Sequence, residues 1–303
     1  MKIGLMIASA GAQNLDAVLS QFEQAEARGF ASAWIPSVRG YDALTAIALA
    51  GRLTSTIELA TFVIPTYPRH PSALAEQALT TQAATGGRLT LGIGLSHRVS
   101  MARLGFDWDH PVRHLREYLS CLTPLLRGES VTFAGEELTL NEAQVTVPDV
   151  PPPSVLVAAL GPQLLRLTGR LADGTAIWMG GPRYIAEHAV PTITAAAKEA
   201  GRPAPRIVAG LPICVTSNAD AVRERANRAF GRYGELPSYR AILDRQEAGA
   251  SPGDVALIGD EATVQAGIDE LRAAGVTDLI ASVYAPRGED PERTYALLKF
   301  LAM

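Results

Sequence analysis

Strand-like and helix-like segments alternate along almost the whole of this 303-residue chain. Short runs of apolar and β-branched residues predict strands, and apolar residues three and four positions apart predict helices. The predicted strands span 2–8, 33–35, 57–64, 89–95, 155–158, 175–179, 206–215 and 279–284. The predicted helices span 14–29, 43–53, 71–84, 112–126, 162–172, 182–200, 219–233, 261–274 and 291–301. Strands that alternate with helices eight times, without two tandem halves around a glycine fingerprint, predict a (β/α)8 TIM barrel rather than a doubly wound sheet.

Residues 1–303 are predicted to form a single domain, because 48% of the chain is hydrophobic and one barrel uses most of its length. Two segments interrupt the alternation. Residues 128–153 read as a surface insertion with a small hairpin, and residues 235–259 read as a second, irregular insertion. The predicted architecture is therefore a TIM barrel with two insertions.

The third predicted strand is apolar or β-branched on both faces from Leu59 to Ile64, as in a strand covered by protein on both sides. Pro65, Pro68 and Pro71 follow it. Proline cannot donate to a strand ladder, so the chain must leave the sheet there as an ordered loop. Such a loop, at the carboxyl end of a buried parallel strand, lies where α/β proteins bind ligands.

The loops after the strands of a TIM barrel build its active site. Here they begin with Ser9-Ala10-Gly11, Pro36-Ser37, Ile64-Pro65-Thr66, Leu95-Ser96-His97-Arg98, Leu160-Gly161-Pro162, Gly180-Gly181-Pro182, Thr216-Ser217 and Tyr284-Ala285. The absence of Asp and Glu from these loop starts disfavours a glycosidase carboxylate pair and a Mg²⁺ or Zn²⁺ site, and the absence of Lys disfavours Schiff-base chemistry. Such loops suit an organic cofactor that brings its own reactivity.

His97 is the one group in these loop starts with an ordinary pKa near neutrality, so it is the first candidate for proton transfer, with a structural loop histidine as the alternative. Gly161 and Pro162 are a candidate phosphate cradle at a helix N-terminus, although they serve equally well to start a helix. His110 and His114 are four residues apart, but Pro111 keeps His110 outside the helix. We therefore expect no metal site.

A formal net charge of −4 gives no general attraction to nucleic acid or to anionic lipid, and no apolar run is long enough to span a membrane. Cys121 and Cys214 are too far apart in sequence for a paired metal or redox motif, so we expect buried, reduced thiols. The run from Ile3 to Ile7 is too short for a signal peptide. These features predict a cytoplasmic protein that acts on a small molecule.

Four motifs in order resemble the bacterial luciferase-like superfamily, and specifically its coenzyme F420-dependent oxidoreductase branch. They are Phe62 to Pro71, Gly86 to Gly94, Ala158 to Pro162, and Leu171 to Gly174. The resemblance covers nearly the whole chain. It implies hydride transfer at C5 of a deazaflavin that is held across the barrel mouth, and a non-proline cis peptide in the third strand, which here would be Phe62–Val63.

The resemblance also implies which residues contact the cofactor. Carried over position by position, they are Ser37, Thr61, Phe62, Val63, Gly94, Leu95, Ser96, Ala159, Leu160, Gly161 and Pro162. Sugar-phosphate dehydrogenases of this branch place an Asp-His pair after the second strand and a glutamate after the fourth. The matching positions here are Ser37, Val38 and His97, so this chain departs from that pattern.

The resulting prediction is an F420-dependent oxidoreductase that acts on a small, fairly apolar organic substrate, with His97 as the candidate catalytic residue. An FMN-dependent monooxygenase that uses O₂ and a partner reductase is the first alternative, because both reactions use the same cradle. A non-catalytic cofactor-binding protein is the second. The family further implies a homodimer or a higher homo-oligomer.

Overall fold

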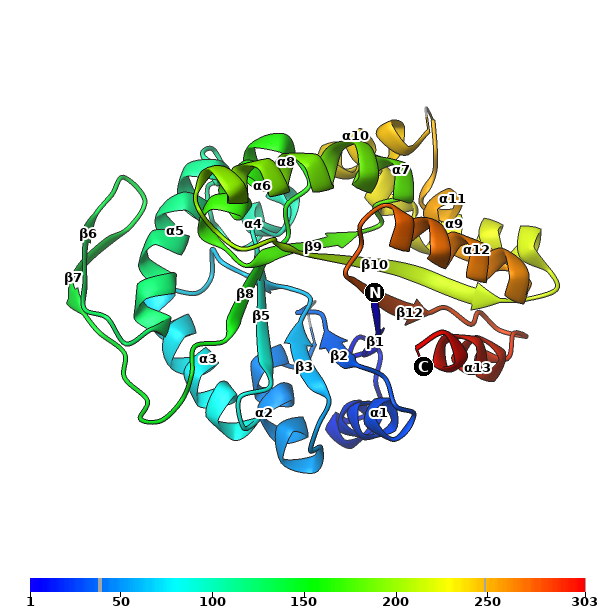
Figure 1. Cartoon of the computed structure of the whole chain (residues 1–303), viewed down its shortest axis with the longest axis horizontal. Coiled ribbons are helices and arrows are strands. Elements are labelled where there is room, and N and C mark those ends of the chain that lie inside the picture. The colour runs from blue at the N-terminus through cyan, green and yellow to red at the C-terminus, as the bar shows by residue number, and fades with distance from the viewer. Residues whose placement is uncertain (38–39, 248, 303) are drawn as a thin grey trace.

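The computed structural model describes residues 1–37, 40–247 and 249–302. Within these residues, eight parallel strands close into a ring (Figure 1). In order around the ring they are β1 (Lys2–Met6), β2 (Ser32–Ile35), β3 (Glu58–Thr61), β5 (Leu89–Gly94), β8 (Ser154–Val157), β9 (Gly174–Trp178), β10 (Arg206–Val215) and β12 (Asp278–Val283). The ring closes because β12 pairs with β1 on one side and with β10 on the other. The predicted (β/α)8 barrel is confirmed.

Helices surround this ring. They are α1 (Leu15–Ala27), α2 (Ala43–Leu53), α3 (Pro71–Ala84), α5 (Pro111–Leu126), α6 (Pro162–Leu171), α8 (Val190–Glu199), α9 (Ala219–Glu235), α12 (Glu261–Ala273) and α13 (Pro291–Ala302). The single helix predicted at 182–200 is instead α7 (Pro182–Tyr184), a π-helical turn at Ile185–Ala189, and α8. Pro191, at the start of α8, lacks the N–H that a continuous α-helix needs there, which accounts for the irregular turn before it.

The segment 128–153 contains an antiparallel hairpin of β6 (Val131–Ala134) and β7 (Thr139–Ala143). The prediction that 235–259 is irregular is wrong for most of its length. It forms α10 (Pro237–Gln246), α11 (Pro252–Val255) and β11 (Leu257–Gly259), and β11 pairs in parallel with the end of β10. At ten residues, β10 extends past the end of its pairing with β9 and needs this further partner. Two more short elements, β4 (Ile64–Pro65) and α4 (Arg98–Ala102), were not predicted.

The barrel interior is closed at the amino-terminal ends of the strands. Arg206 bridges Glu58 at 2.8 Å and Asp278 at 2.7 Å, and its guanidinium lies 6.0 Å from the ring centroid of Trp34. Above this layer, a buried apolar cluster fills the middle, formed by Trp34, Ala60, Leu156, Ala176, Val208 and Ile280. The opposite end, where the strands terminate, is therefore the end available to a ligand. We call it the mouth.

Two further findings concern the predictions about membrane spans and cysteines. Of the helices that the structure describes, none combines the length and apolar character that a bilayer crossing requires. Cys121 and Cys214 are both buried and unbridged.

Candidate functional site

The floor of the mouth is a bulge in the third barrel strand. β3 ends at Thr61 and β4 begins at Ile64, and between them the Phe62–Val63 peptide is cis, as predicted. The hydroxyl of Thr61 donates to the carbonyl of Gly92 at 2.7 Å and accepts from its N–H at 2.8 Å. These bonds tie the bulge to β5.

Glycines on the neighbouring strands leave room for the bulge. A Cβ atom on Gly94 would lie 2.8 Å from a methyl of Val63, and one on Gly210 would lie 2.8 Å from the ring of Phe62. The Phe62 ring itself packs edge-to-face between Trp34 and Trp178, with centroids 5.9 Å and 6.2 Å away. Phe62 and Val63 remain partly exposed. The mouth thus has an apolar floor that a side chain at either glycine would disturb.

Four neighbouring strands carry the predicted cofactor contacts, because β2, β3, β5 and β8 are consecutive in the ring. Their ends bring together Ser37, the bulge, the Gly94–Ser96 segment and the Ala159–Pro162 segment. Thr61 and Ala159 are fully buried, backbone and side chain alike, so this structure does not expose either residue to a ligand in the mouth. Ser96 has a φ of 60°, unusual for a residue other than glycine, and it turns the chain sharply at the end of β5. Val38 lies outside the described residues.

His97 follows this turn, is half-buried, and precedes α4. Its ring lies edge-on to Tyr239 and Tyr233, with centroids 5.8 Å and 6.3 Å away. Burial lowers the pKa of His97, and the nearby charge of Arg232 lowers it further. The lowered pKa favours the neutral imidazole at pH 7, which accepts a hydrogen bond at one ring nitrogen and donates one at the other.

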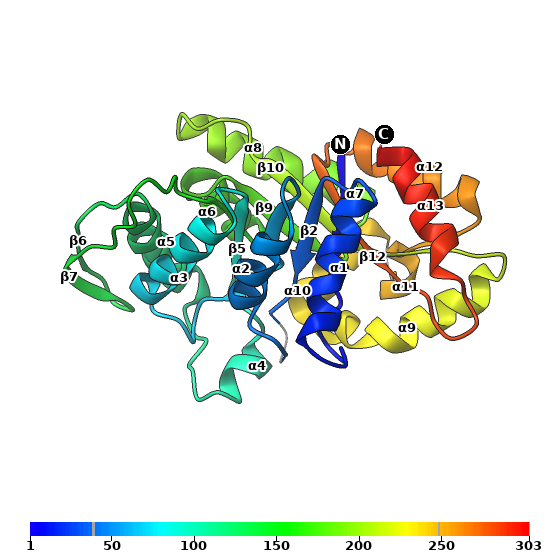
Figure 2. The same ribbon diagram turned by 90° about the horizontal axis from the view of Figure 1, so that it is seen from below.

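The tyrosines that face His97 come from a part of the chain where sequence reasoning found no site. Phe230 and Tyr233 on α9 pack against Trp178 with centroids 6.2 Å away in both cases, and Tyr239 on α10 packs 4.9 Å from Tyr233. Figure 2 shows α4, α9 and α10 on the same side of the molecule. Phe230 and Tyr233 lie within the helix predicted at 219–233, where their spacing was the available signal, whereas Tyr239 lies in the segment 235–259 that was predicted to be irregular.

Two Gly-Pro helix starts lie at the mouth, and the structure distinguishes them. At α7, Oε1 of Gln246 accepts from the N–H of Arg183 at 2.9 Å and sits against Gly181. At α6, Gly161 is the N-cap, no side chain caps the helix, and a Cβ atom there would meet nothing within 4 Å. The hydroxyl of Tyr184 holds the loop before α6 by donating to the carbonyl of Leu160 at 2.6 Å. Free N–H groups and the helix dipole make the start of α6 the better anion site.

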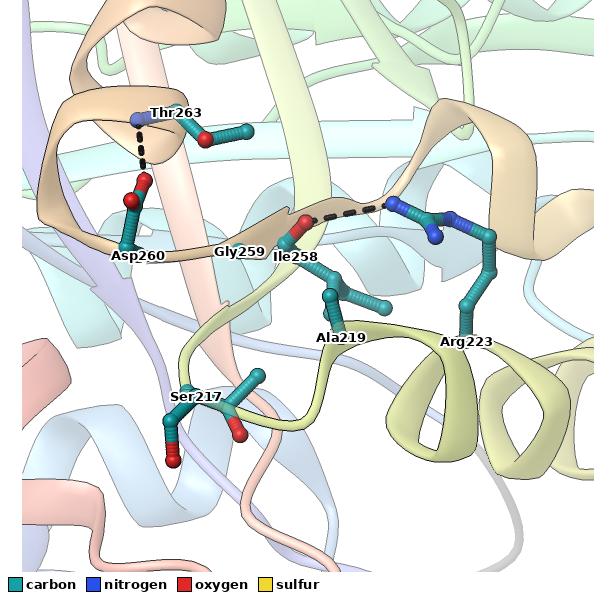
Figure 3. A pocket seen from close by; sticks show the side chains of 8 residues that line it. Ser217, Ala219, Arg223, Ile258, Gly259, Asp260 and Thr263 are labelled. Carbon is teal, nitrogen blue, oxygen red and sulfur yellow. Dashed lines mark hydrogen bonds between the residues drawn. The ribbon is translucent and has the colours of Figure 1, made fainter.

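A cavity of about 460 Å³ lies beyond the end of β10 (Figure 3). Thr216, Ser217, Ala219, Arg223, Ile258, Gly259, Asp260 and Thr263 line it. Both charged groups of this lining are already engaged. Arg223 donates to the carbonyl of Ile258 at 3.3 Å, and Asp260 accepts from the N–H of Thr263 at 2.9 Å. We assign no ligand to this cavity. Within the described ranges, no group of three or more His, Cys, Asp or Glu residues is arranged to hold a metal ion.

The chain was compared with known proteins. The family model described as luciferase-like monooxygenase matches residues 1–278. A 5,10-methylenetetrahydromethanopterin reductase of Methanolobus tindarius is 26% identical over 304 residues, which cover 90% of this chain and 91% of the relative.

Solved structures share the fold. The coenzyme F420-dependent tetrahydromethanopterin reductase of Methanopyrus kandleri superposes with a TM-score of 0.77 at 22% identity, covering 99% of this chain and 98% of that one. The oxygenating constituent of 3,6-diketocamphane monooxygenase from Pseudomonas putida, in complex with FMN, superposes with a TM-score of 0.76 at 19% identity, covering 100% and 97%.

Proposed function

Because the chain belongs to the luciferase-like monooxygenase family, we propose that it is an oxidoreductase that transfers hydride between coenzyme F420 and a small organic substrate. The observation that carries the proposal is the floor of the mouth, a bulge at Phe62–Val63 backed by Gly94 and Gly210. The relatives support F420 over FMN, because the Methanolobus tindarius relative is named a methylenetetrahydromethanopterin reductase and a tetrahydromethanopterin reductase that shares this fold is named as coenzyme F420-dependent.

The residues present fit a flat, three-ring cofactor. Phe62 and Val63 would lie against one face of the ring system, and Gly94, Leu95 and Ser96 would contact its edge from the end of β5. When bound, F420 supplies the hydride-accepting or hydride-donating carbon C5. The protein orients that ring and shields one of its faces from water.

The phosphate of the cofactor would bind at the start of α6. The N–H groups there are uncapped, and Gly161 has open space around it. Leu160 and Pro162 flank this position, and Ser37 at the end of β2 would contact the opposite part of the cofactor. An anion at this helix terminus satisfies N–H groups that otherwise bond to water.

His97 is the proposed catalytic residue. Its neutral imidazole would accept the substrate proton at one ring nitrogen when the substrate is oxidised, and the protonated ring would return that proton when the substrate is reduced. Phe230, Tyr233 and Tyr239 form an aromatic wall, which favours a neutral, fairly apolar substrate. FMN-dependent oxygenation remains the alternative, because related folds bind FMN.

The test is a titration of the purified protein with F420 and, separately, with FMN. The expected result is that F420 binds more tightly and raises the melting temperature more. Oxidation of reduced F420 would then be measured with a panel of enones, imines and quinones. Tighter binding of FMN, with O₂ consumption in the presence of a flavin reductase, would replace the proposal by the monooxygenase. Binding of either cofactor without turnover of any panel member would favour a carrier.

We also propose that residues 1–303 form one domain, that the protein acts in the cytoplasm, and that it assembles as a homodimer or a higher homo-oligomer. The two buried thiols support a reducing compartment. Light scattering coupled to size-exclusion chromatography tests the assembly state, and a monomer at micromolar concentration would contradict it.

A further inference from the structure

The loop that follows the bulge is held by α5, from outside the barrel. Thr66 is fully buried, and its N–H donates to the carbonyl of Gly94 at 2.9 Å. Its hydroxyl lies 3.1 Å from Nε2 of His114 on α5. A line of polar contacts therefore runs from the helix through the loop to the last residue of β5.

The same helix also holds the next residues of the loop. The ring of Tyr67 stacks flat on the ring of His114, with centroids 3.9 Å apart and an angle of 4° between the planes. The hydroxyl of Tyr118 donates to the carbonyl of Arg69 at 2.9 Å. His114 is 7% exposed, so its contacts are made inside the protein. The loop between the bulge and α3 is thus fixed at three residues by one helix.

We infer that His114 is a positioning residue for the mouth. Its imidazole fixes Thr66 and Tyr67, and through the bond from Thr66 to Gly94 it fixes the end of β5, where the cofactor is proposed to bind. The inference rests on the proposed function. It goes beyond that function because His114 lies outside the proposed cofactor contacts and beyond the strand ends that supply them.

The chemistry of the site explains a histidine at this position. Burial lowers the pKa of His114, although the charges of Glu137 and Glu117 oppose that change. A neutral imidazole offers Nε2 to the Thr66 hydroxyl, as donor or acceptor according to the tautomer, as well as a flat face to Tyr67. Phenylalanine keeps the flat face but leaves a buried hydroxyl without a partner, whereas glutamine keeps a hydrogen-bonding group and loses the ring.

Glu117 provides a matched control, because it lies on the same helix and is 4% exposed. Its carboxylate accepts from the N–H groups of Glu136, Glu137 and Leu138 at 3.1, 2.8 and 3.1 Å. These residues form the turn of the β6–β7 hairpin, not the mouth. Glu117→Gln and His114→Phe therefore both weaken buried polar contacts of α5. Only the contact of His114 leads to the proposed cofactor site.

The experiment makes two measurements on each variant. Fluorescence titration gives the affinity for F420, and hydrogen exchange of the cofactor-free protein reports the order of its backbone. We expect His114→Phe to weaken F420 binding about tenfold and to speed exchange in 62–70 and 92–98, with partial recovery in His114→Gln. We expect Glu117→Gln to speed exchange only in the hairpin and to bind F420 like the wild type.

Equal F420 affinity in His114→Phe and Glu117→Gln, or unchanged exchange in 62–70 and 92–98, would overturn the inference. If the wild type binds neither F420 nor FMN, the proposed function fails, and the exchange result alone decides whether His114 orders the mouth. If His114→Phe does not fold, Thr66→Val removes the same contact from the loop side and is compared with Glu117→Gln in the same way.

Discussion

Glu26, in the last turn of α1, clamps the chain where it enters the third barrel strand. Its Oε1 accepts from the N–H groups of Thr56 at 2.7 Å and Ile57 at 3.0 Å, and also from Ser55 at 2.9 Å. Partial burial by itself raises the pKa of the carboxyl, but these N–H groups and the Thr56 hydroxyl outweigh it and lower the pKa from 4.5 to about 2. The folded state therefore favours the charged form.

Glu26→Gln removes that charge and keeps the shape. A shift of this size corresponds to about 3 kcal/mol at most, and because the carboxyl is partly solvated we expect a loss of about 1–2 kcal/mol at pH 7. Since the folded-state pKa lies below the unfolded value, this contribution is fully present above about pH 4.5 and disappears as the pH falls toward 2.

Urea unfolding followed by circular dichroism between pH 3 and pH 7 measures the effect. The free-energy difference between wild type and Glu26→Gln should stay constant down to about pH 5 and shrink below it. Glu23→Gln, an exposed substitution on the same helix, is the control and should change little at any pH. A difference that does not depend on pH, or a loss no larger than that of Glu23→Gln, would refute the reasoning.

Three further outcomes are expected. Arg206→Met leaves the carboxylates of Glu58 and Asp278 without their cation and should lower the free energy of unfolding in urea by about 3–5 kcal/mol. The control Arg202→Met, which removes a surface ion pair, should lower it by less than about 1 kcal/mol. Similar losses in the two variants would contradict this prediction. For substrate oxidation, where His97 acts as the base, its lowered pKa places the acid limb of the activity profile below pH 6.5, and His97→Asn should abolish that limb. A retained limb assigns it to another group. Gly161→Asp should weaken cofactor binding at least about tenfold, because its charge repels the phosphate. Gly161→Ala should bind the cofactor like the wild type, because its Cβ would meet no atom within 4 Å. Equal affinities of the two variants would show that the phosphate does not bind at this helix start.

The barrel strands were predictable because each is a short apolar run between turn residues. Leu89 to Gly94 is buried at every position, as expected for a strand covered on both faces. The bulge was predictable only through the family resemblance, since nothing in the local residue types of Phe62 and Val63 requires a cis peptide. Strand periodicity therefore gives the fold, and the motif gives the special geometry within it.

The contact between the aromatic wall and His97 was not predictable, because Tyr233 and Tyr239 reach His97 only through tertiary packing. The segment 235–259 lacks strand alternation, and its elements are placed by tertiary contacts, such as the pairing of Leu257–Gly259 with the extended end of β10. His114 escaped detection for a similar reason. Its partners Thr66 and Tyr67 lie more than 40 residues earlier in the chain, and sequence spacing pointed only to a possible pair with His110.

The floor and the wall of the mouth depend on different parts of the chain, and this separation has a functional consequence. The floor is set by backbone geometry, because a side chain at Gly94 or Gly210 would collide with the bulge. The wall is set by side chains of α9, the helix that follows β10, and of α10, which lies in the segment 235–259. Under the proposed function, changes in the wall that keep its packing against Trp178 would alter which substrate fits and leave the glycines that shape the floor in place. His97 belongs to a strand end but packs against Tyr233 and Tyr239, so in its proposed catalytic role it would link a new wall to the chemistry.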